Sequence, residues 1–215
     1  MNYATLIQAI QDYTENTETT FVNNIDIFIE QASRRIVLDI DLPVFHKNVS
    51  GTMTTSNSYL AKPTDFLTAF SLATISAGNV YTYLLPKDVS FMREMSPDTD
   101  DTGQPKYYGH YSDESFILSP IPDANYTTEL HYKYAPAPIS SIVTTTWLGD
   151  NADTALLYGC LVEAYTFMKG EAELIGLYDT RYKAALQGFK KLGEFDDQRD
   201  WYRDGASTAQ VVAAR

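Results

Sequence analysis

The stretch from Asp153 to Met168 constrains the fold more than any other part of this chain, because it is apolar on nearly every side of a helix. Its sequence, DTALLYGCLVEAYTFM, lacks the broad polar face that a helix on a protein surface carries. A helix of this kind has to be surrounded by other elements. We therefore expect it to be buried among further helices, as the centre of a bundle.

Apolar residues at three- and four-residue spacing predict those further helices at both ends of the chain. Residues 3–13 form a short one, and Phe21–Asp39 a longer amphipathic one. A last helix is predicted from about Ala172 to Trp201, with Leu177 and Tyr182 in its apolar stripe. The N-terminal and C-terminal helices would thus pack together into one bundle.

Between about Val44 and Thr146 the pattern changes to short alternating runs separated by Pro, Gly, Asn and Ser, which is typical of antiparallel strands joined by turns. One short helix is predicted within Lys87–Met95. The clearest strand runs from Thr128 to Tyr134, with one packed and one wet face. The predicted inner residues are Thr128, Leu130, Tyr132 and Tyr134, and the predicted exposed residues are Glu129, His131 and Lys133.

The fold class predicted from these patterns is α+β, a helical bundle with a β-rich antiparallel insertion. Its expected parts are N-terminal helices (1–43), the β-rich insertion (44–147), C-terminal helices (148–201) and an extended C-terminal tail (202–215). The end of the tail, ASTAQVVAAR, has only Val211 and Val212 as large apolar residues. By itself it is either a disordered terminus or a segment that orders on a partner through these valines and Arg215.

A formal net charge of −12 argues against direct nucleic-acid binding, because phosphate backbones repel such a chain and no basic run offsets this. The charge is compatible with lining a passage for DNA. We expect no membrane contact, since no stretch approaches the roughly 18 apolar residues of a membrane span and the start lacks the pattern of a signal peptide. The lone Cys160 can form no intrachain disulfide, so synthesis in a reducing cytoplasm is expected.

Catalytic and metal-binding motifs are missing from the sequence, and its three histidines lack metal-ligand spacing. The segment Asp98–Gly103 matches the start of a calcium loop, but Gly109 stands where the loop requires a bidentate Glu. We therefore expect no enzyme activity, no cofactor and no metal. The alternatives are an ion at Asp98–Gly103, or an enzyme with an unfamiliar site near Asp98–Asp101 and Asp113.

Several segments in series resemble the head-to-tail adaptor proteins of tailed bacteriophages, also called connector or head completion proteins, and in particular the podovirus type with a β-rich insertion. The resemblance spans about Thr19 to Gln198 and rests on the order of its motifs rather than on one signature. The segments are YLAKPTDFLTAFSL, LPKDVSFMREM, GQPKYYGHYSDESFILSPIPDANYTTELHYKYAPAPIS and TTTWLGDNADTALLYGCLVEAYTFMKGEAE.

The resemblance implies a structural virion protein of the neck, forming a homo-oligomeric ring, a dodecamer, under the portal protein and continuing the DNA channel without sequence-specific DNA binding. It implies that the C-terminal tail docks on the portal, which makes Val211, Val212 and Arg215 the expected contacts. The insertion would face tail nozzle or fibre proteins, with Glu129, His131 and Lys133 available to a neighbour. The alternative is a tail-associated module whose exposed tyrosines stack on the carbohydrate of a receptor.

Overall fold

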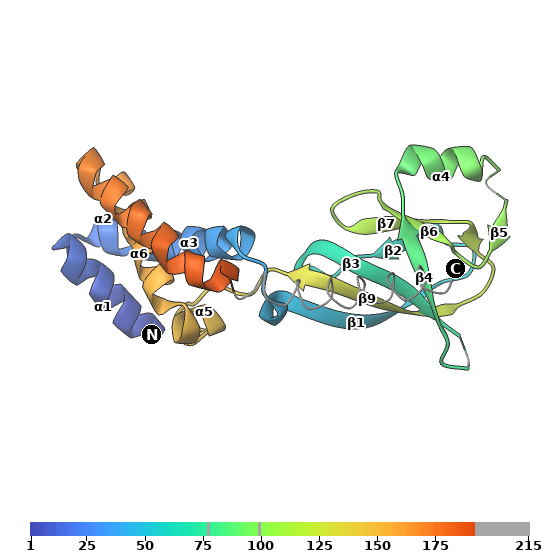
Figure 1. The fold of residues 1–215 in the computed structure, drawn as a ribbon, viewed down its shortest axis with the longest axis horizontal. Coiled ribbons are helices and arrows are strands. Elements are labelled where there is room, and N and C mark those ends of the chain that lie inside the picture. The colour runs from blue at the N-terminus through green and yellow to red at the C-terminus, as the bar shows by residue number, and fades with distance from the viewer. Residues whose placement is uncertain (77, 99, 192–215) are drawn as a thin grey trace, which may run out of the picture. The chain divides into compact units, whose positions relative to one another are not determined.

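The computed structural model describes residues 1–191 except residues 77 and 99, and it divides into two compact units (Figure 1). The helical unit comprises Met1–Val44 together with the described residues from Ala137 onwards, and the β unit comprises Phe45–Pro136. The chain is therefore a mixed α+β protein in which N-terminal and C-terminal helices pack together and the sheet is inserted between them, as the sequence predicted.

The helical unit begins with α1 (Tyr3–Thr14), whose first turn is closed by a capping box between Asn2 and Thr5. The helix predicted over Phe21–Asp39 is in fact two helices, α2 (Thr19–Val22) and α3 (Ile25–Asp39). The break lies at Asn23 and Asn24, where the Asn24 side chain donates to the Thr20 carbonyl. Asparagine competes in this way for backbone groups that a continuous helix would use.

The C-terminal part of the unit contains α5 (Trp147–Asn151), α6 (Asp153–Phe167) and a further helix over 172–191, drawn in orange-red and unlabelled in Figure 1. As predicted, α6 is the buried helix, and it contacts α1, α3 and α5. Gly159 makes the contact with α3 close, since a Cβ at this position would lie 3.1 Å from the Ala32 Cβ.

Polar contacts around the buried ring of Tyr182 hold the helix over 172–191 against α3. The Tyr182 hydroxyl donates to Asp39 at 2.9 Å, and the Arg35 guanidinium lies 4.6 Å from the centre of the Tyr182 ring. Arg35 also forms an ion pair with Asp179 at 2.8 Å. These contacts join segments that are more than 130 residues apart in the chain, which is why the β unit is an insertion rather than a terminal addition.

The β unit begins at the last residue of a short 3-10 helix over Pro43–Phe45 and contains nine strands among the described residues. The strands are β1 (His46–Met53), β2 (Tyr59–Ala61), β3 (Phe66–Ile75), β4 (Tyr81–Pro86), β5 (Thr102–Gly103), β6 (Tyr107–His110), β7 (Ser115–Ser119), β8 (Ile121–Pro122) and β9 (Tyr126–Tyr134). Seven of them form one sheet in the order β1-β9-β3-β4-β6-β7-β2, and β5 pairs with β8.

Most neighbouring strands are antiparallel, as predicted, but β4 pairs with β6 in parallel, and so do the two short strands β5 and β8. A parallel pair needs a long crossover connection. The chain provides one for the first pair, because α4 (Val89–Met95) and the loop after it separate β4 from β6. The short helix predicted within Lys87–Met95 is thus confirmed.

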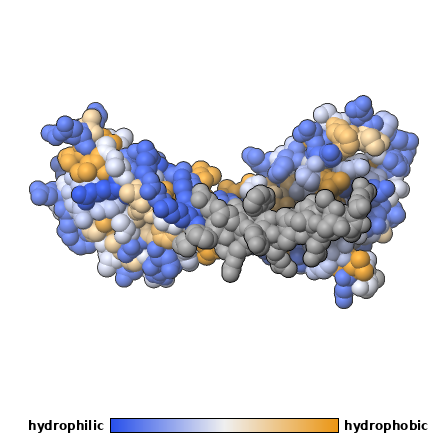
Figure 2. Space-filling view, in the orientation of Figure 1, coloured by the Kyte–Doolittle hydropathy of each residue, from blue (hydrophilic) through white to orange (hydrophobic). Residues whose placement is uncertain are grey.

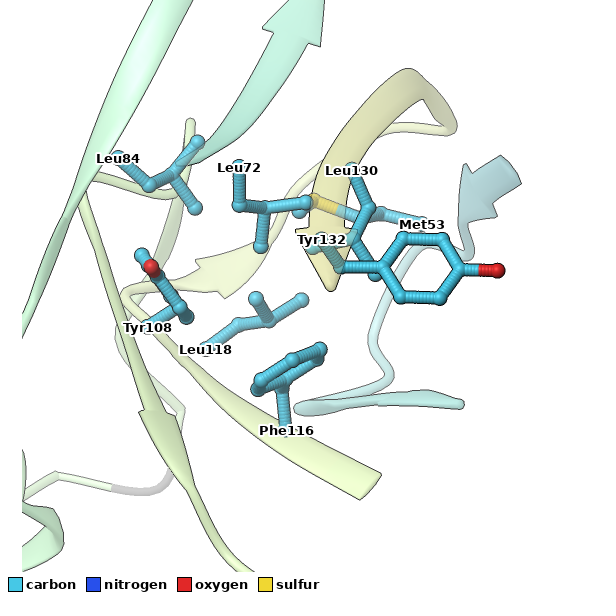
Figure 3. Packing of buried hydrophobic residues seen from close by; sticks show 8 residues of the cluster. All are labelled: Met53, Leu72, Leu84, Tyr108, Phe116, Leu118, Leu130 and Tyr132. Carbon is cyan, nitrogen blue, oxygen red and sulfur yellow. The ribbon is translucent and has the colours of Figure 1, made fainter. Parts of the chain in front are cut away.

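The core of the β unit is a single hydrophobic cluster on the inner face of the sheet (Figure 3). Its buried members are Met53, Leu72, Leu84, Tyr108, Phe116, Leu118, Leu130 and Tyr132. Thr128, Leu130 and Tyr132 are buried, which confirms the predicted inner face of β9 for these residues. The Tyr132 ring packs in the cluster while its hydroxyl points out of it and donates to Asp65 at 2.8 Å.

Candidate functional site

The sheet has an outer face opposite to its core, and aromatic rings from three strands meet there. Phe70 of β3 lies 4.2 Å from His46 of β1 and 5.2 Å from His131 of β9, between ring centroids. Phe70 is the residue where the register between β3 and β9 shifts from Ala69 to Ser71. A β-bulge turns a side chain away from its regular position, and here the irregularity accompanies the addition of Phe70 to the outer face.

Tyrosines extend this surface along β4. Tyr81 and Tyr83 stack with their ring centroids 6.5 Å apart, and the Tyr81 hydroxyl donates to Glu129 at 3.3 Å. The negative charge of Glu129 raises the pKa of Tyr81 above its usual value. Tyr83 remains 65% exposed. We call the surface formed by His46, Phe70, Tyr81, Tyr83, Glu129 and His131 the outer sheet face.

The structure corrects the exposure predicted for the second face of β9. Glu129 and His131 are half-buried, and Lys133 is buried, with 9% of its surface exposed. One reason is that β9 lies between β1 and β3, and the rings of His46 and Phe70 from these neighbours lie against His131. Contact of these three residues with a neighbouring subunit stays a prediction.

A cleft of about 940 Å³ opens at another place in the β unit, around Lys62. The Lys62 ammonium donates to the Ser112 carbonyl and lies 5.2 and 5.0 Å from the ring centres of Phe66 and Phe116. Burial lowers the pKa of Lys62, and burial followed by the charge of Lys62 lowers that of His110. This is a cation held against aromatic rings.

The rim of this Lys62 cleft carries both polar and aromatic groups. Asp113 and Glu114 line it on the turn between β6 and β7, and Tyr59 lines it from β2. Tyr59 and Tyr111 have ring centroids 4.9 Å apart, and both rings are partly exposed. The walls come from segments around residues 57–67 and 110–115, a combination that no local sequence motif reveals.

The carboxylates proposed for an alternative enzyme site are not brought together. Asp98 lines a small cavity beside Met92 and Ser119, whereas Asp113 belongs to the Lys62 cleft. The Asp98 side chain accepts a hydrogen bond from the Asp100 amide at 2.9 Å, so it is used within its own loop. Across residues 1–76, 78–98 and 100–191, no group of three or more His, Cys, Asp and Glu side chains is placed to hold a metal ion.

The lone cysteine is unsuited to chemistry. Cys160 is completely buried in α6, and burial raises the pKa of its thiol, which removes it as a nucleophile.

The predicted portal contacts Val211, Val212 and Arg215 lie outside the described residues. Within the part of the chain that the structure describes, no helix is long and apolar enough to cross a membrane.

Comparison of the sequence with models of known protein families gives a match. A family model described as SU10 adaptor protein matches residues 1–211, which is nearly the whole chain and includes both units. No curated protein matches the sequence.

Proposed function

This chain belongs to the SU10 adaptor protein family and is a phage adaptor with a structural role, and we propose that its copies form a ring under the portal that joins the head to the tail and continues the DNA channel. The observation that carries the proposal is the family match over residues 1–211. An adaptor binds other virion proteins, and we propose as its partners the portal protein above and tail nozzle or fibre proteins below.

The helical unit is proposed to make the contacts within the ring. Its surface carries large apolar side chains that its own core does not cover, including Ile27 and Leu38 of α3. These two residues are about three helical turns apart and therefore on the same side of α3. Exposed apolar side chains aligned on one helix face favour burial against another subunit.

The β unit is proposed to face the tail components, with the outer sheet face as its contact surface. The hydrophobic areas visible in the described part of Figure 2 are small and separate on a mostly hydrophilic surface. Aromatic side chains such as Phe70, Tyr81 and Tyr83 are the type that anchors protein interfaces. The neighbouring Glu129 and His131 supply polar groups at the same place.

The charge of the chain supports the proposed DNA channel. A net charge of −12 makes an adhesive contact with DNA unfavourable, which suits a passage through which a genome has to move in both packaging and ejection. Assembly in the virion neck, twelve-fold symmetry and docking of the C-terminal tail through Val211, Val212 and Arg215 belong to the same proposal.

The docking part is tested by co-elution with the portal ring of the same virus, using size exclusion with light scattering. The full-length chain is compared with a variant that carries Val211→Asp and Val212→Asp. A control with Ser207→Asp and Thr208→Asp adds the same charge to the same tail. We expect the full-length chain and the control to co-elute with the portal, and the valine variant to lose at least about tenfold in affinity.

Two results would change this account. Unimpaired co-elution of the valine variant would overturn tail docking while leaving the ring in place. Failure of the full-length chain to join the portal would overturn the head-to-tail role itself.

A second candidate function is carbohydrate binding in the Lys62 cleft. The observation that favours it is that the exposed ring of Tyr59, backed by Tyr111, lines the cleft together with Asp113 and Glu114. Sugars are bound by ring stacking and by hydrogen bonds to their hydroxyls. Binding to a glycan array that Tyr59→Ala abolishes would support it. Absence of any glycan binding by the intact protein would reject it.

A further inference from the structure

Helix α4 covers the outer face of the sheet over β6 and β7 (Figure 1). Tyr107 and Gly109 of β6 alternate with the core residue Tyr108, so they belong to the outer face. Met92 of α4 is buried there, and a Cβ on Gly109 would lie 2.8 Å from the terminal carbon of Met92. Phe91 packs edge-on against Tyr107, with 5.7 Å between the ring centroids. The outer face of this sheet therefore accepts a helix.

The neighbouring strand β4 leaves its outer face open to water. Tyr81, Tyr83 and Leu85 alternate with the core residue Leu84 and are 46%, 65% and 57% exposed. Leu85 is paired in register with Tyr107, so this row of side chains adjoins the outer-face contact of α4. We call Tyr81, Tyr83 and Leu85 the β4 strip. It is an uncovered row beside a covered one.

The position of β4 in the sheet limits what can cover the strip. Because β4 lies between β3 and β6, it offers no full-length edge to an added strand, and a partner has to pack on the outer face. A second sheet would need several uncovered strands, and α4 bounds the free area on the side of β6. Strands are about 4.8 Å apart, so an element over β3 and β4 would lie about 10 Å from α4 over β6 and β7. Packed helices have this separation, and the free area therefore suits one helix beside α4.

The charges around the β4 strip define the chemistry of a helix that fits. No charged residue occurs from Val80 to Pro86. On the side of β9, the Glu129 carboxylate accepts a hydrogen bond from the Tyr81 hydroxyl. On the side of α4, the Lys87 ammonium lies 5.0 Å from the centre of the Phe91 ring. A complementary helix has an apolar face for the strip, a basic residue towards Glu129 and an acidic residue towards Lys87.

We propose that the β4 strip docks an amphipathic helix of a tail protein, which lies beside α4 on the outer face of the sheet. The inference deepens the proposed function and rests on it in one respect, since the β unit is the part proposed to face the tail. It adds the structural class of the partner segment, the strand that holds it and the charges that orient it.

Binding of the tail nozzle and fibre proteins of the same virus tests the proposal, with each protein added separately to the complex of the full-length chain and the portal. Tyr83→Glu and Leu85→Glu introduce a charge at exposed positions of the strip, which the fold should tolerate. We expect each to weaken the binding of one tail protein at least about tenfold. Ile142→Glu adds the same charge at a position that is 92% exposed and outside the strip, and it should leave this affinity unchanged. Co-elution with the portal should be equal for all of these variants.

Photo-cross-linking identifies the segment that occupies the strip. p-Benzoylphenylalanine replaces Tyr83 in one variant and Leu85 in a second, and it replaces the exposed Tyr13 of the helical unit in a control. Two residues of a strand and four residues of a helix both span about 6 Å. We therefore expect both strip variants to cross-link to one tail protein, at residues three or four apart in its sequence, and the Tyr13 control to give no such product.

Unchanged tail binding in both glutamate variants overturns the proposal. So do cross-links to a second copy of this chain, or to tail residues two apart, which indicate an extended segment. These failures are distinguishable from failure of the proposed function. If a tail protein binds without involving the strip, the inference alone falls. If no tail protein joins the complex of the chain and the portal, the proposed tail contact of the β unit falls with it.

Discussion

Substitutions at Tyr182 test how the helical unit is held together across the insertion. Tyr182→Phe removes one hydrogen bond, the 2.9 Å contact with Asp39, and keeps the ring beneath the Arg35 guanidinium. A hydrogen bond to a charged group contributes about 1.5–3 kcal/mol. Asp39 is exposed and regains water in the variant, so we expect a loss of unfolding free energy at or just below the lower end of this range, about 1–1.5 kcal/mol.

Tyr182→Ala removes the same hydrogen bond and also the ring, which is completely buried. Deleting a buried aromatic ring costs about 3–5 kcal/mol in lost contacts and cavity formation. Tyr182→Ala should therefore lower the unfolding free energy about three times as much as Tyr182→Phe does. In an Asp39→Ala background, Tyr182→Phe should cost less than about 0.5 kcal/mol, because the hydrogen bond is already gone.

The assay is urea unfolding followed by tryptophan fluorescence. Trp147 of α5 lies against Phe189 of the helix over 172–191, so in a Trp201→Phe background the fluorescence reports the unfolding of the helical unit. An unfolding free energy that Tyr182→Ala lowers by less than about 1 kcal/mol would refute the reasoning. So would equal losses for Tyr182→Phe in the presence and absence of Asp39.

Three further predictions concern single residues. Gly109→Ala should lose about 1–3 kcal/mol of stability in chemical denaturation, because its Cβ would lie 2.5 Å from the Lys87 carbonyl oxygen. Gly176→Ala should gain up to about 1 kcal/mol, because a Cβ at this helical position meets nothing within 4 Å. Burial would raise the pKa of Asp65, but hydrogen bonds from Lys47 and Tyr132 outweigh this and hold the pKa below its usual value. The ionised Asp65 therefore stabilises the fold above about pH 4, and this stabilisation is lost as the pH falls further. The drop in melting temperature between about pH 7 and 3, measured by circular dichroism, should be smaller in Asp65→Asn. The Cys160 thiol should react with a thiol reagent only at the rate of unfolding, and rapid labelling of the native protein would contradict its burial in α6.

Local periodicity predicted most of the elements, because most helices and strands have one dry and one wet side, but it did not reveal the break between α2 and α3. The apolar α6 and the alternation of Leu130 and Tyr132 both indicated where a core had to lie. Periodicity could not reveal how strands pair, since pairing joins distant segments. His46–Met53 lies beside Tyr126–Tyr134, and the parallel pairing of β4 with β6 depends on the crossover through α4.

The candidate site was less predictable for the same reason. Alternation assigns Lys133 to the outer face of β9, but whether that face is open depends on side chains from β1 and β3. The Lys62 cleft and the outer sheet face are likewise built by segments far apart in sequence. In contrast, the order of motifs along the chain was enough to indicate the adaptor family, because it does not depend on which strands meet.

The number of adaptor copies on an isolated portal ring tests the central proposal most directly. Native mass spectrometry of the complex formed from the full-length chain and the portal would measure it. A closed ring under the portal predicts one saturated species with as many adaptors as portal subunits, twelve of each. A complex that saturates at one or a few adaptors, or that grows without a limit, would contradict a ring that continues the DNA channel.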